Sequence, residues 1–149
     1  MAKKGKVKKV PRTIVYTIPT EAFDKPLLLS IVIGEQTDEH DVAGRYCPSR
    51  GEMTIFDIGW QETLYHEVLE GSILVNMAHY TNNYDPSDLI MFFDHKRFTS
   101  ICSYASAAYV KLYFMIVDVF EIDGNTIIGL SKYGKELLRK SQIEVKEIF

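Results

Sequence analysis

Cysteine, tryptophan and histidine are scarce in this sequence: its 149 residues include two cysteines, one tryptophan and four histidines. Cys47 and Cys102 form no CxxC pair, which indicates neither a disulfide framework nor a zinc ribbon and favours a reducing compartment. The most apolar stretch, residues 105–120, is interrupted by Lys111 and Asp118, so no segment matches the roughly 20 apolar residues of a membrane span. We therefore expect a cytoplasmic protein that does not enter a membrane.

An excess of one charge is also lacking. The chain has 17 Lys and Arg against 20 Asp and Glu, and its net charge of -3 argues against nucleic-acid binding by the whole domain. Six cations lie within residues 1–12, but no apolar run follows them, so they do not form a secretion signal. We expect residues 1–11 to be a basic flexible tail, the one part suited to nucleic acid, ahead of a single domain at 12–149.

Apolar residues make up 46% of the chain, which suffices for one core. Residues 12–17 and 27–33 are rich in β-branched and aromatic side chains and are predicted strands, with Pro19, Pro26 and Gly34 at their boundaries. A short strand is expected at 45–47. Residues 52–58 alternate apolar and polar side chains and predict a half-buried strand.

Two long helices are predicted next. Residues 60–79 carry Leu64 and Val68 at helical spacing, and they follow the last of these strands directly. A turn-rich segment then leads to a second helix, which is expected to begin near Asp94 as N-cap and to end at about residue 117.

The C-terminal part carries an Asp-Gly hairpin signal between residues 120–122 and 126–130. A short helix at 131–140 and a final strand at 143–148 are expected to follow. The elements together predict an α+β fold. In it, a small N-terminal, mostly antiparallel sheet packs on a central active-site helix and a second long helix, with the C-terminal hairpin and helix as an extension.

The most informative motif is HExxE, within residues 62–71 (ETLYHEVLEG) on the first predicted helix. His66 and Glu70 lie four residues apart and therefore on one side of a helix, where an imidazole and a carboxylate can bind one metal ion. Glu67 takes the position of the general base in the related HExxH motif. Ile73 shares the side of His66 and Glu70, which predicts apolar surroundings for the pair. An ordinary His-Glu ion pair on a helix surface is the open alternative.

A catalytic zinc ion usually has three protein ligands, so HExxE needs a third. His95, at the start of the second long helix, is the best candidate, because its side of that helix is expected to face the interior. Cys102 shares this side and is expected to be a small core residue. His40 and His79 are expected to be solvated, the first in an acidic loop and the second at a helix end.

The HExxE helix, the preceding strand with GEMTI at 51–55 and the DHKRF segment at 94–98 resemble small phage and prophage proteins of the ImmA/IrrE-like metallopeptidase family. The resemblance covers about residues 28–117. It implies a zinc cofactor, His66 as a ligand, Glu67 as the catalytic base and Glu70 as a ligand in place of the usual second histidine. His95 matches a histidine often seen at the next helix of that family.

The leading hypothesis from the sequence is a zinc-dependent peptidase, in which His66, Glu70 and His95 hold the ion and Glu67 activates a water for attack on an amide of a peptide or protein substrate. A carboxylate ligand makes such a water less acidic than three neutral imidazoles would. The oxyanion stabiliser stays open among four tyrosines: Tyr65, Tyr80, Tyr84 and Tyr109.

The alternative is a noncatalytic phage interaction protein that keeps a metallopeptidase-like scaffold and binds a host protein in the bacterial cytosol.

Overall fold

The computed structural model describes residues 9–34, 44–80 and 95–149, with side chains throughout these ranges except at 76–80, 95 and 97. Its main sheet has five strands in the order β3-β4-β2-β1-β7. The pairing of β2 with β4 is parallel, and the other neighbours are antiparallel. The strand bounds are β1 Thr13–Ala22, β2 Lys25–Gly34, β3 Gly44–Cys47, β4 Glu52–Phe56 and β7 Glu144–Ile148.

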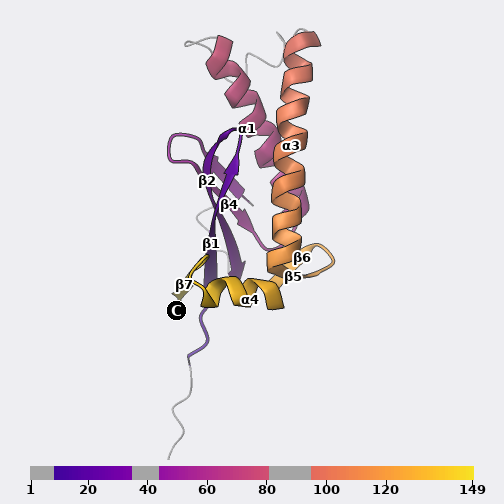
Figure 1. Ribbon diagram of the computed structural model, residues 1–149. Helices are drawn as coiled ribbons and strands as arrows, with labels where there is room; N and C mark the ends of the chain where they lie inside the picture. The colour runs from indigo at the N-terminus through magenta and orange to yellow at the C-terminus, as the bar shows by residue number, and fades with distance from the viewer. Residues whose placement is uncertain (1–8, 35–43, 81–94) are drawn as a thin grey trace, which may run out of the picture.

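Three helices and a small two-stranded sheet complete the described fold. Figure 1 shows two long helices side by side next to the main sheet, with a third, short helix across the end of the sheet near β7. These elements are α1 Trp60–Tyr80, α3 His95–Val119, β5 Phe120–Asp123, β6 Thr126–Leu130 and α4 Lys132–Arg139. The predicted α+β class, the mostly antiparallel sheet and both long helices are therefore confirmed.

Alternation along the central strands places one face of the sheet against the helices. In β2, Leu27, Leu29 and Ile31 are at most 3% exposed, and in β4, Met53 and Ile55 are completely buried. Burying side chains of this size stabilises the fold by about 2 kcal/mol each. The helices supply the opposite side of the core from four fully or almost fully buried residues: Leu64, Val68, Leu112 and Ile116.

Strand β1 extends beyond its predicted end at Thr17 to Ala22, and Pro19 lies inside it, opposite Leu28. Proline has no N–H and is tolerated where the strand edge is open. The neighbouring strand β7 pairs with β1 only as far as Thr17, which leaves the side of β1 away from β2 open at Pro19. The predicted end at Thr17 is therefore too early, because β1 continues past Pro19 on its pairing with β2.

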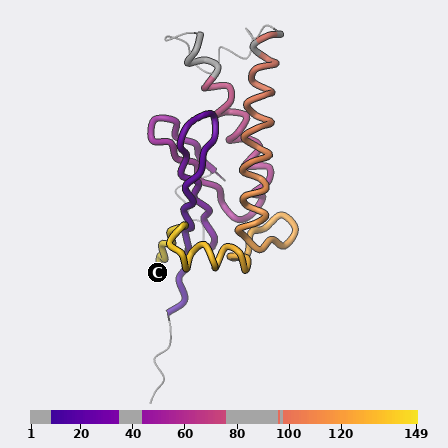
Figure 2. The backbone as a smooth tube through the Cα atoms, in the orientation of Figure 1, coloured from indigo at the N-terminus to yellow at the C-terminus, as the bar shows by residue number. Residues whose placement is uncertain are grey.

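The C-terminal part does more than extend the domain. After the predicted Asp-Gly hairpin and α4, whose N-cap Ser131 accepts a hydrogen bond from the Gly134 N–H at 3.0 Å, the chain returns to the main sheet as β7. There the Arg12 N–H donates to the Ile148 carbonyl at 2.8 Å. The main sheet is therefore built from both ends of the described chain, as the tube in Figure 2 shows.

Helix α3 is long and apolar enough over Phe98–Val119 to cross a membrane by length and composition, and 22% of this stretch is buried. Lys111 and Asp118 interrupt this stretch, but its mean hydropathy is still high enough for a membrane-spanning helix. A buried core helix of a soluble protein can have the same length and composition. The cytoplasmic location stays a prediction.

Candidate metal centre

The helix that carries HExxE begins at a rigid junction with β4. The Asp57 carboxylate accepts hydrogen bonds from the Gly34 N–H at 3.3 Å and from the Ile58 N–H at 3.0 Å, which ties the ends of β2 and β4 together. Gly59 follows with a φ of +68°. Trp60 is 1% exposed, and the centre of its ring lies 5.5 Å from that of Tyr113. The start of α1 is therefore fixed relative to the sheet.

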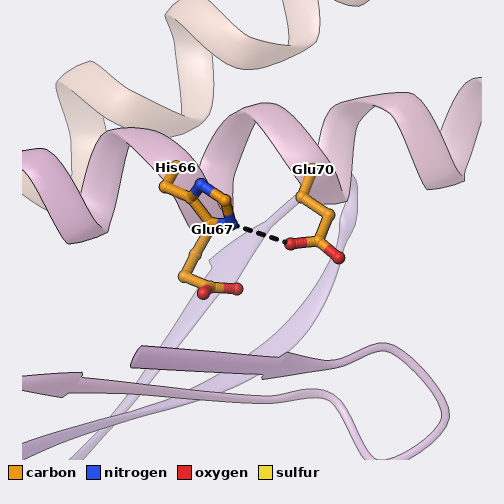
Figure 3. A group of neighbouring side chains, drawn as sticks. All are labelled: His66, Glu67 and Glu70. Atoms are coloured by element: carbon orange, nitrogen blue, oxygen red, sulfur yellow. Dashed lines mark ion pairs between the residues drawn. The ribbon is translucent and has the colours of Figure 1, made fainter. Parts of the chain in front are cut away.

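The three residues of the motif converge. One donor atom from each of His66, Glu67 and Glu70 can be chosen so that the three atoms lie within 4.8 Å of one another. Figure 3 shows the three side chains on α1. His66 Nε2 is 3.3 Å from Glu70 Oε2. Two ligands bound to one zinc ion at about 2.1 Å cannot be more than roughly 4.2 Å apart, and imidazole nitrogen and carboxylate oxygen are both ordinary zinc ligands. The donors and the spacing of His66 and Glu70 therefore fit such an ion.

The surroundings of this pair differ from the prediction. The side chains of His66 and Glu70 are 70% and 55% exposed, so the expected apolar environment is wrong. The reason lies in which part of α1 the sheet covers. Strand β3 lies over the neighbouring stripe of the helix, which includes Glu67, and leaves the side of His66 and Glu70 open to solvent. A substrate or a metal ion can reach the pair from outside.

Glu67, by contrast, is 5% exposed. The backbone of Tyr46 in β3 lies near its carboxylate and favours the charged form. Burial, and next the negative charge of Glu70, raise the pKa of Glu67, while His66 and the Tyr46 backbone act in the opposite direction. A carboxylate with a raised pKa is a stronger base than an ordinary glutamate, which suits a general base.

The structure does not bring together all predicted ligands. His95 is the first residue of α3, and its side chain lies outside the described part of the structure, as does that of His79. Its side of the helix is not interior as expected, because Thr99 and Cys102 are exposed. The predicted core position of Cys102 is wrong. His40 and the expected N-cap Asp94 lie outside the described residues.

Two of the four candidate tyrosines meet next to the motif. The rings of Tyr65 and Tyr109 are 5.7 Å apart in an edge-on arrangement, and Tyr65 is 58% exposed. Burial, followed by Tyr113 and Tyr65, raises the pKa of Tyr109. The side chain of Tyr80 and all of Tyr84 lie outside the described residues. The oxyanion role is left unassigned.

Sequence reasoning missed the contribution of β3, a short strand without a motif. The sequence signal that could have indicated this contact lies on α1 and not on β3. Thr63, Glu67 and Gly71 are each four residues from the next, which places a small side chain, a carboxylate and a glycine on one stripe of the helix. Such a stripe admits a close neighbour on the side where the carboxylate lies.

No protein-family model matches the chain, and neither a curated protein nor a solved structure matches it. The resemblance to ImmA/IrrE-like metallopeptidases therefore rests on the motif and its context alone.

Proposed function

We propose that the protein is a zinc-dependent hydrolase of the peptidase class, with a peptide or protein as its substrate. His66, Glu70 and His95 hold the ion, and Glu67 is the general base. The observation that carries the proposal is the convergence of the HExxE side chains on one side of α1, with two accessible donors beside a buried carboxylate.

A bound zinc ion would supply acidification of the attacking water and polarisation of the substrate amide. The residues of the chain have separate roles in binding and in proton transfer. His66 and Glu70 present their donor atoms to solvent, where an ion and a substrate can reach them. Glu67 accepts the proton of the water, and its buried position keeps its pKa above the ordinary value. Strand β3 packs against the side chain of that carboxylate at Gly44.

The first test is zinc content per chain, measured by elemental mass spectrometry on untagged protein purified without a chelator. We expect near-stoichiometric zinc in the wild type and in Glu67→Gln, and its loss in His66→Ala and His95→Ala. Zinc retained in His66→Ala would overturn the site. Zinc lost in His66→Ala but kept in His95→Ala would remove only His95 from the ligand set.

A second readout separates binding from chemistry. Glu67→Gln is expected to keep zinc and to abolish hydrolysis of fluorescently labelled casein, because an amide cannot accept the proton of the water. A wild type that holds no zinc even after zinc is added back would favour the noncatalytic interaction protein. Equal casein hydrolysis by wild type and Glu67→Gln would remove Glu67 from the reaction.

A further inference from the structure

Helix α1 and strand β3 approach each other unusually closely at two points, and a glycine makes each approach possible. The stripe of α1 that faces β3 consists of Thr63, Glu67 and Gly71. Gly44 in β3 lies over the first two, and the side chain of Tyr46 lies against the third. Glu67 is therefore held between two contacts along a single line of the helix.

The first contact is formed by the backbone of β3. A Cβ atom on Gly44 would lie 2.3 Å from Thr63 Cγ2, 3.0 Å from the Thr54 carbonyl oxygen and 3.5 Å from Glu67 Cγ. The first two distances are too short for a carbon atom to be accommodated without a shift. Only a glycine lets β3 lie this close to the Glu67 side chain.

The second contact involves the tip of the β1–β2 hairpin. A Cβ atom on Gly71 would lie 2.7 Å from Phe23 Cζ and 3.1 Å from Tyr46 Cε1. The rings of Phe23 and Tyr46 lie 5.3 Å apart, and Phe23 is 4% exposed. Phe23 and Asp24 have φ values of +56° and +58°, as the two central residues of a tight hairpin turn require. The turn places the buried Phe23 ring against Gly71 and Tyr46.

We infer that Phe23, Gly44 and Gly71 are positioning residues that hold β3 against the Glu67 side chain. His66 and Glu70 are placed by the geometry of α1 alone, whereas the third member of the motif depends on these three residues. The functional meaning of this arrangement rests on the proposed role of Glu67 as base. The arrangement itself does not require a metal ion.

The test is amide hydrogen exchange at Tyr46, followed by NMR on the full-length, metal-free protein. Gly71→Ala is expected to speed exchange of this amide about tenfold, because the added Cβ atom displaces Tyr46 and loosens β3 locally. The core amides of Leu29 and Ile31 should keep their rates. The matched control is Gly129→Ala, since a Cβ atom there meets nothing within 4 Å. Wild-type exchange at Tyr46 in Gly71→Ala would overturn the inference.

Two further variants keep the test informative if Gly71→Ala folds poorly. Phe23→Leu adds no atoms, and it should also speed Tyr46 exchange because it removes the ring that holds Tyr46. The double variant Phe23→Leu/Gly71→Ala refills part of the vacated space and should exchange more slowly at Tyr46 than either single variant. Additive acceleration in the double variant would contradict a shared contact.

The zinc measurement separates this inference from the proposed function. Gly71→Ala should retain zinc like the wild type but lose casein hydrolysis, because only Glu67 is displaced. Loss of zinc together with activity would mean that Gly71 supports the whole helix and not the base. A wild type without zinc would refute the proposed function, while the Tyr46 exchange rates would still decide whether the three residues position Glu67.

Discussion

Two neighbouring sides of α1 differ in how far their functional residues are buried. The inner stripe, Thr63, Glu67 and Gly71, lies under β3 with almost no free space. The outer pair, His66 and Glu70, is more than half exposed and contacts solvent. The difference shows that tertiary packing sets the position of the base, while the helical repeat alone sets the position of the ligands. Changes on the inner stripe should therefore affect packing as well as the reaction, whereas changes of the outer pair should affect zinc binding with little effect on stability.

The largest expected effect is on the inner contact. Gly44→Val should lower the free energy of unfolding by about 3 kcal/mol, because the new side chain overlaps Thr63 and the backbone of Thr54. Guanidinium denaturation measures this change. Gly129→Ala, where the added carbon has open space, should stay within about 0.5 kcal/mol of the wild type. Equal losses in both variants would show that β3 is not closely packed on α1.

A smaller effect on the free energy of unfolding is expected from the buried carboxylate of Glu67, and it depends on pH. Burial raises the pKa of Glu67 in the folded protein above its ordinary value of 4.5, so the folded state binds more protons than the unfolded state between the two pKa values. The free energy of unfolding must then fall as the pH rises through this interval, and the stabilisation by the protonated form is lost above the folded pKa.

Urea denaturation of the metal-free wild type and of Glu67→Gln, from about pH 4 upward, isolates this contribution because the other carboxylates are common to both. The wild type should lose stability relative to Glu67→Gln until the folded pKa is passed, and the difference should then stay constant. Parallel curves would mean that the carboxylate is not buried in solution.

The smallest effect on stability is expected for the outer pair. His66→Ala should change the free energy of unfolding by less than about 0.5 kcal/mol, because an exposed pair four residues apart on a helix contributes little. The same variant should lose its zinc. A large loss of stability in the metal-free variant would place His66 in a structural role and remove the contrast between the two sides of α1.

The sequence predicted the elements well because their signals are local. Periodicity defined α1 and α3, and Asp123-Gly124 marked the hairpin, where Gly124 has the expected positive φ of 59°. The wrong predictions concern contacts between distant segments. Strand β1 can continue through Pro19 because β7, which lies more than a hundred residues later in the chain, pairs with it only as far as Thr17.

The HExxE motif likewise has one feature that follows from local sequence and one that depends on a distant segment. That His66 and Glu70 lie together follows from a spacing of four residues. Their exposure does not, because the covered side of α1 is decided by the position of β3, which comes earlier in the chain and carries no motif. Cys102 was misplaced for a related reason: the sequence shows that a helix is apolar but not which side meets a neighbour.

The most direct test of the contrast is a calorimetric zinc titration of two variants that differ only in which carboxylate of α1 is neutralised. We expect Glu70→Gln to lose the zinc affinity of the wild type, because an accessible ligand is removed, and Glu67→Gln to retain it, because the base does not hold the ion. Loss of zinc binding in Glu67→Gln with retention in Glu70→Gln, or equal affinities in both, would contradict the separation of base and ligands.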